Sequence, residues 1–276
     1  MKRFTISEQE KKQIKGLYNL NEDMVSDFFT NFLTKAGIDT DLKSSSKTEP
    51  SKDAEDTDDN TKPDLKRVTN GNVKVVGNYN SEQLKNINYL IDAMNDVGIT
   101  DPYAQVGILS VIAKESGFVP KSEYSYSKTP NQRLRKIFGK RLSKYSDSEL
   151  SSLKQNDKNF FNEVYGKMIG NQGGDDGYRY RGRGFNQLTG IKNYEKYGNL
   201  IGMGNKLVED PELVNDVKIA SKIAIAFFTK GKSTNSFPRF SSKKDSAIYF
   251  ADINSGGGAV SHRDKAIEKL NNFEIV

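Results

Sequence analysis

Residues 178–190 read YRYRGRGFNQLTG, and two short pairs, NY and YG, follow at 193–194 and 197–198. The glycines of this stretch let the backbone come close to a ligand, because glycine carries no side chain. Its amide and hydroxyl side chains suit the hydroxyl and N-acetyl groups of a sugar; they are Gln187, Thr189 and Asn193. The stretch therefore predicts a loop that approaches a carbohydrate closely.

A candidate acid stands upstream of this loop. Asp101-Pro102 is typical of a helix start, and the apolar run that follows ends at Glu115-Ser116-Gly117. A carboxyl beside apolar walls holds its proton more strongly, as a general acid requires. Glu123 follows eight residues later, beyond the helix-breaking Pro120, so we expect the two acids to face each other across a groove. With 36 acidic residues in the chain, the alternative that both are ordinary solvated side chains stays open.

Three further stretches keep a fixed order around the glycine-rich loop. They are AKESGF at 113–118, DPELV at 210–214 and INSGGG at 253–258, with Arg263 just beyond. Together with the loop they resemble glycoside hydrolase family 19, a group of chitinases and phage-type endolysins in the lysozyme-like superfamily. The signature of that family reads roughly GRG(F/P)IQLTG followed by NY and YG. The resemblance covers about 200 residues of this chain.

The resemblance implies a role for several residues. Glu115 would protonate the leaving oxygen, Glu123 would act as base on water, and Thr189 would hold that water. The reaction would invert the anomeric centre, with the carboxyls roughly 6.5 to 9.5 Å apart. The resemblance also implies a substrate groove lined by Gln187, Asn193, Asn254 and Arg263. Further candidate substrate contacts, chosen from the side chains of the loop and not from the family, are Tyr180, Arg183 and Tyr194. Structural alternatives stay open. In these alternatives Arg181 and Arg183 pair with carboxylates in the core of the fold, the tyrosines are packing residues, and Asn254 only makes a turn.

Some positions depart from the family pattern. One glycine instead of two follows the acid-Ser pair, and EYSYS at 123–127 is shorter than the usual stretch around the second acid. Asn186 stands where an apolar residue is usual, and the chain has no tryptophan. Glu123 is therefore matched less closely to the family than Glu115, and the sugar-binding subsites are expected to differ.

Composition excludes several chemistries. The chain has no cysteine and a single histidine, His262, so thiolate nucleophiles, Cys-based zinc sites and multi-histidine metal sites are ruled out. We assign His262 no role and expect neither a metal nor a cofactor. The sequence has no run of 18 apolar residues, and its first 15 residues are polar and charged. We therefore expect no membrane span and no export signal.

The net charge of +6 is placed unevenly along the chain. Residues 1–40 balance at zero, residues 41–68 carry −2, and residues 69–276 carry +8. A basic part suits a polyanionic partner, such as nucleic acid, an acidic membrane or a bacterial wall rich in carboxylates and phosphates. The net charge alone does not distinguish among these partners. The resemblance favours the wall, so we expect peptidoglycan as the partner and neither nucleic acid nor membrane.

The chain is predicted to be modular. Residues 1–38 indicate two short helices that anchor or dock the protein, or that pack on its catalytic domain. Residues 39–68 mix serine, proline and alternating charges without an aromatic side chain, a composition typical of a flexible linker. Residues 69–276 are predicted to form a mainly α, lysozyme-like catalytic domain. Ser81 is expected to cap its first helix, and Asp101-Pro102 is expected to start the second. Later helices are expected at about 131–138, 148–166, 191–198, 214–230, 245–254 and 263–270.

These features lead to one functional hypothesis and two rivals. We expect a phage-type peptidoglycan hydrolase that cuts β-1,4 glycosidic bonds. It would be made in the cytoplasm and act on the wall after release, or be carried on a virion through residues 1–38. A chitinase with the same mechanism is the first alternative. The second is a non-catalytic wall-binding or structural virion component with the same fold.

Overall fold

A computed structural model describes residues 69–70, 72–229, 237–256 and 260–276 of the chain. All of them belong to the compact unit Pro63–Val276. The predicted helical module at 1–38 and the predicted linker at 39–68 lie outside the described residues.

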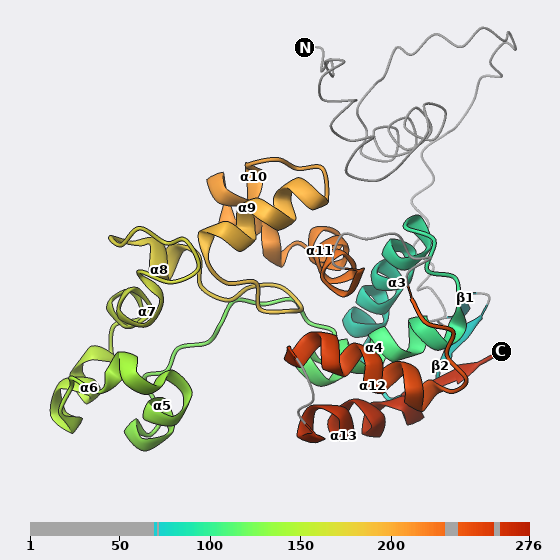
Figure 1. The fold of residues 1–276 in the computed structure, drawn as a ribbon, viewed down its shortest axis with the longest axis horizontal. Coiled ribbons are helices and arrows are strands. Elements are labelled where there is room, and N and C mark those ends of the chain that lie inside the picture. Colours follow the sequence, from blue (N-terminus) through green and yellow to red (C-terminus); the bar gives the residue numbers. More distant parts are fainter. Residues whose placement is uncertain (1–68, 71, 230–236, 257–259) are drawn as a thin grey trace, which may run out of the picture. The chain divides into compact units, whose positions relative to one another are not determined.

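The described part is mainly α-helical, as predicted (Figure 1). Its α-helices are α3 (Ser81–Asp96), α4 (Pro102–Ser116), α5 (Asn131–Phe138), α6 (Asp147–Leu153), α7 (Asp157–Tyr165), α8 (Asp176–Arg179), α9 (Ile191–Leu200), α10 (Lys206–Glu209), α11 (Val217–Thr229), α12 (Lys243–Ser255) and α13 (Val260–Lys269). Three short 3₁₀ helices are η1 (Gly139–Leu142), η2 (Pro211–Asn215) and η4 (Leu270–Asn272). The strands β1 (Thr69–Asn70), β2 (Val73–Val75) and β3 (Phe273–Ile275) form an antiparallel sheet in the order β1-β2-β3, with Val75 opposite Phe273. No helix in this part of the chain is long and apolar enough to cross a membrane.

Helix α4 lies at the centre of the largest hydrophobic cluster. Most of its residues are buried, because its sequence is apolar on every face. It packs against α12 and α13 (Figure 1). The approach to α12 is close at Gly107, where a Cβ would lie 2.6 Å from Ser246 Oγ. The helix is therefore accessible only near its two ends, and its C-terminal end carries Glu115.

Two smaller clusters bury the rest of the apolar side chains. One joins α9, α10, η2 and α11 around Tyr194 and Leu207, and the other joins α5, η1, α6 and α7 around Phe160 and Phe161. Many aromatic rings of the second set contact one another edge to face, as Phe138 and Phe160 do with ring centroids 5.4 Å apart, and Phe161 and Tyr165 stack. Each cluster fixes one of the segments that carry candidate site residues.

Two predicted helix features are corrected. Asn80, not Ser81, caps α3, because its side chain accepts a hydrogen bond from Gln83 N at 2.9 Å and the Gln83 side chain binds back to it. The single helix predicted over 148–166 is two helices, α6 and α7. Asn156 separates them, since its side chain accepts from Asn159 N at 3.0 Å and starts a new helix.

Candidate active site

A strained turn fixes the end of α4 that carries Glu115. Gly117 has φ 58° and Phe118 has φ 63°, so two successive residues occupy the left-handed region. A bulky residue adopts this conformation only where its surroundings require it. Phe118 is fully buried, its ring meets Tyr79 at 5.2 Å, and its carbonyl accepts from Asn86 Nδ2 at 2.8 Å. The turn redirects the chain toward Glu123.

Glu115 has its two carboxyl oxygens in different surroundings. Oε1 accepts hydrogen bonds from Lys114 Nζ and, at 2.6 Å, from Asn254 Nδ2. No described residue donates to Oε2. The side chain is 28% exposed, so it lies at the surface but against neighbours. A proton on this carboxyl belongs on Oε2, because Oε1 already accepts two bonds.

Asn254 and Arg263, two predicted groove residues, lie at neighbouring helix ends. Asn254 in α12 contacts Glu115 directly. Arg263 in α13 instead binds Asp252 through Nε and Nη2, both at 2.7 Å, and this ion pair raises the pKa of the guanidinium. Arg263 thus joins α13 to the turn of α12 just before Asn254.

Glu123 is held by three donors. Its Oε1 accepts from Tyr126 OH at 2.7 Å and from Tyr165 OH at 3.0 Å, and its Oε2 accepts from Gly182 N at 3.3 Å. Burial, followed by the hydrogen bond to Glu123, raises the pKa of Tyr126, and burial followed by the Glu123 charge raises that of Tyr165. Both phenols therefore stay protonated and donate. A carboxylate offers about four lone-pair positions, so the remaining one belongs to Oε2.

Gly182 brings three oxygens together. A Cβ at this position would lie 2.8 Å from Gln187 Oε1, 3.2 Å from Glu123 Oε2 and 3.4 Å from Thr189 Oγ1. Glu123 N also donates to Gly182 O at 2.7 Å, so the loop after α4 is bonded to the glycine-rich stretch at this residue. The structure thus places Glu123, Gln187 and Thr189 around one backbone position.

The polar side chains of the glycine-rich stretch position one another. Thr189 Oγ1 donates to Gln187 O at 2.9 Å, and Asn193 Nδ2 donates to Thr189 O at 2.8 Å. Gln187 Nε2 donates to Lys121 O at 2.9 Å, and Gln187 itself has φ 52°. Because the hydroxyl of Thr189 donates its proton to Gln187 O, its oxygen can still accept hydrogen bonds.

Three predicted substrate contacts are buried instead. Tyr180, Arg183 and Tyr194 are 3%, 2% and 0% exposed, so in this conformation they offer a polymer almost no surface. Arg183 binds Glu212 through Nε at 3.0 Å and Tyr194 OH through Nη1 at 3.0 Å. The alternative in which an arginine of the motif pairs with a carboxylate therefore fits Arg183, and we assign these three residues to support of the loop.

Sequence reasoning missed several residues of the site. Tyr126 and Tyr165 bind Glu123, and Glu212 joins the glycine-rich stretch to η2. Glu212 lies in the DPELV motif, so that motif was a usable signal. Tyr165 lies 42 residues from its partner, and nothing in the local sequence marks it.

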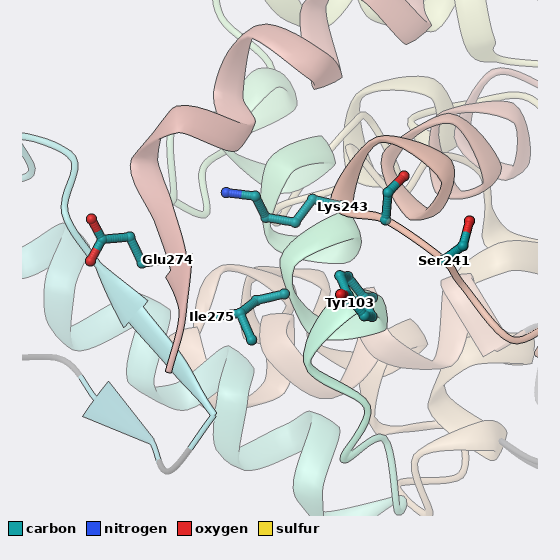
Figure 2. A pocket seen from close by; sticks show the side chains of 6 residues that line it. Tyr103, Ser241, Lys243, Glu274 and Ile275 are labelled. Carbon is teal, nitrogen blue, oxygen red and sulfur yellow. The ribbon is translucent and has the colours of Figure 1, made fainter.

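Hollows on the described part of the molecule include one beside the candidate site and one far from it. One of about 300 Å³ borders the candidate site and is lined by Ile169, Asn186, Gln187, Leu188, Thr189, Asn193, Tyr197, Ile223 and Phe227. The other, of about 490 Å³, is lined by Tyr103, Ser241, Ser242, Lys243, Glu274 and Ile275 (Figure 2). It lies at the opposite end of α4 from Glu115, roughly 18 Å away along the helix axis. Lys243 and Glu274 are already engaged there, with Phe273 O and Lys74.

The chain matches no protein-family model and no curated protein sequence. Among solved structures it is similar to chitinase C from Streptomyces griseus HUT6037, with a TM-score of 0.38 and 16% sequence identity. The match covers 67% of this chain and 66% of the chitinase chain, just under two thirds of its length. A TM-score this low does not establish membership of a family.

Proposed function

We propose that residues 69–276 form a glycoside hydrolase that cuts β-1,4 bonds in an N-acetylated polysaccharide. Glu115 donates the proton and Glu123 acts as base. The observation that carries the proposal is the contrast between these two carboxyls. Glu115 leaves Oε2 without a donor among the described residues, whereas Glu123 is held by three donors and keeps a lone pair on Oε2.

The surroundings of Glu115 suit a general acid. Its proton sits on Oε2, where it can reach the oxygen of a glycosidic bond. After the proton has left, Lys114 and Asn254 stabilise the carboxylate through Oε1, and neither has to move. Proton donation of this kind contributes about 10²- to 10⁴-fold to the rate.

The surroundings of Glu123 suit a base that acts through water. Its Oε2 lies beside Thr189 Oγ1 and Gln187 Oε1 around Gly182. A water bound by Thr189 would give its proton to Oε2 and attack the anomeric carbon from the face opposite the leaving group. The reaction would therefore invert the anomeric configuration.

We propose bacterial peptidoglycan as the polymer and a phage-type wall-lytic protein as the context. The net charge of +8 on residues 69–276 supports this choice, because the wall is rich in carboxylates and phosphates. The protein would act on the wall after release from the cell, or be carried on a virion through residues 1–38.

Digestion of purified peptidoglycan and of chitin oligomers, with mass analysis of the products, tests the proposal. We expect glycan fragments from peptidoglycan, an α-anomer as the first product by proton NMR, and a loss of at least about 10²-fold in Glu115→Gln. That variant keeps the shape of the side chain but has no proton to give. Cleavage of chitin but not of peptidoglycan would mean that the substrate is chitin. A β-anomer as first product would exclude Glu123 as the base. A fully active Glu115→Gln would overturn the mechanism.

A further inference from the structure

A chain of polar contacts links Glu115 to the single histidine of the sequence. Lys114 Nζ binds Glu115 Oε1 and also lies 2.7 Å from His262 Nδ1. His262 Nδ1 is 3.9 Å from Glu115 Oε1. The lysine side chain is only 11% exposed, whereas that of His262 is 40% exposed. An ammonium with so little exposure needs acceptors, and these two side chains supply them.

The donor and acceptor roles in this chain follow from chemistry. An ammonium can only donate, so His262 Nδ1 must accept. A neutral imidazole that accepts on Nδ1 carries its proton on Nε2. A protonated imidazole has two donors and no acceptor, and it would face the ammonium as a second cation. The contact between Lys114 and His262 therefore exists only while His262 is neutral.

The ionisable neighbours of Glu115 lie at the end of α4 and in α13. Lys114 lies in the last turn of α4, where the helix dipole favours a cation. On α12 and α13, which pack against this end of α4, Asp252 and Arg263 form an ion pair, and Asn254 is uncharged. Lys114 and His262 are the ionisable side chains for which the described part of the chain shows a contact with the Glu115 carboxyl.

We propose that Lys114 is a positioning residue for Glu115 and that neutral His262 holds Lys114 in place. This inference rests on the proposed role of Glu115 as proton donor. The ammonium fixes Oε1, directs the proton to Oε2 and stabilises the carboxylate that forms once the proton has left. His262 supplies the second acceptor that keeps the ammonium there, so protonation of His262 releases the lysine.

One test does not depend on activity. Because the chain has one histidine, ¹⁵N NMR of the labelled full-length protein shows a single imidazole. At a pH where His262 is neutral, we expect the Nε2–H tautomer, and we expect this preference to weaken in Lys114→Met. A dominant Nδ1–H tautomer in the wild-type protein would overturn the proposal.

The pH dependence of kcat/KM is the second test. Removing a cation next to a carboxyl lets it keep its proton to higher pH, so in Lys114→Met the alkaline limb should move to higher pH. The rate at the optimum should fall about 10-fold or more, because the carboxylate formed in the reaction loses its ammonium. His262→Phe, which has no acceptor, should shift the limb the same way, whereas His262→Gln keeps an acceptor and should stay near wild type.

Two controls separate the possible failures. Lys74→Met removes the same charge from an exposed ion pair with Glu274 and should leave the profile unchanged. If Lys114→Met does not fold, as judged by circular dichroism, the comparison of His262→Phe with His262→Gln decides. Unchanged profiles with an inactive Glu115→Gln would overturn the role of Lys114 and His262 alone, whereas an active Glu115→Gln would overturn the proposed function.

Discussion

Gly182 is the residue at which the two halves of the candidate site meet. Its backbone bonds to Glu123 in both directions, and the absence of a side chain leaves space for the oxygens of Gln187, Glu123 and Thr189. Its φ is not in the left-handed region, so its backbone conformation is open to any residue. Glycine is therefore required here only because a side chain would collide with the three oxygens, and not because of its backbone conformation.

Gly182→Ala tests this closeness. The new Cβ would lie 2.8 Å from Gln187 Oε1 and 3.2 Å from Glu123 Oε2, so both side chains must shift. The end of a glutamine side chain moves easily, and we expect the stability to change by less than about 1 kcal/mol. Misplaced catalytic groups lower rates by up to about 100-fold, so kcat should fall by roughly 10- to 100-fold.

Gly184→Ala is the contrasting control for that experiment. Gly184 has φ 75°, and a Cβ there would lie 3.0 Å from the carbonyl oxygen of Val214, which cannot swing away. This variant should lose more thermal stability than Gly182→Ala, which should lose activity with only a small change in melting temperature. Wild-type turnover in Gly182→Ala would show that the three oxygens do not need their present spacing.

At the scale of elements, ion pairs from Glu212 to Arg183 and, at 3.9 Å, to Arg181 tie the glycine-rich stretch to η2. Arg183 binds Glu212, and Asn215 at the end of η2 accepts from Gly184 N at 3.1 Å and donates to Ser122 Oγ at 2.9 Å. The loop after α4, the glycine-rich stretch and η2 are therefore connected by hydrogen bonds. A change in η2 is expected to reach Glu123 through these bonds.

The ion pair makes stability depend on pH. The hydrogen bond from Arg183 lowers the pKa of Glu212 below its ordinary value of 4.5. A carboxyl whose pKa is lowered on folding stabilises the native state above its unfolded pKa, and this contribution is lost as the pH falls through the folded value. Glu212→Gln should therefore be less stable than wild type at pH 7, and the difference should shrink toward pH 3.

Urea unfolding of both proteins between pH 7 and pH 3 measures this difference. Glu274→Gln is a matched control, because the side chains of Glu274 and Glu212 are similarly exposed, at 53% and 61%, whereas their partners differ: Lys74 is 43% exposed and Arg183 only 3%. Exposed ion pairs contribute little to stability, so the control should follow wild type throughout. A constant gap between Glu212→Gln and wild type at every pH would show that the charge of Glu212 does not act on stability.

Local signals predicted the elements better than the contacts between them. Asp101-Pro102 and the Glu-Ser-Gly turn placed α4 correctly, because capping and termination depend on neighbouring residues. The pattern of alternating arginines at 179–183 does not say which arginine is buried. Only the fold does, by placing Glu212 and Tyr194 beside Arg183. The boundary between α6 and α7 was not predicted, because the helical pattern of the sequence continues across it. A single capping residue, Asn156, starts the second helix there.

At the scale of the whole molecule, the chain changes composition near residue 69. The residues beyond this point carry a net charge of +8, both proposed carboxyls and the only histidine. They also bury their own apolar side chains, in clusters that include Val106, Tyr194 and Phe160. A segment with its own hydrophobic core can fold independently. Residues 1–68 are therefore not expected to be needed for the chemistry.

Limited proteolysis of the full-length chain tests this division. The composition of residues 39–68 predicts a linker that cannot bury enough apolar surface to offset the entropy of ordering. Mild digestion should therefore cut within it first and leave a stable fragment that ends at Val276 and keeps its activity on soluble glycan oligomers. Mass spectrometry of the fragment gives the cut site, and its thermal unfolding should match the main transition of the intact protein. Protection of the whole stretch would mean that it is ordered, and loss of activity on cleavage would mean that residues 1–68 contribute to the site.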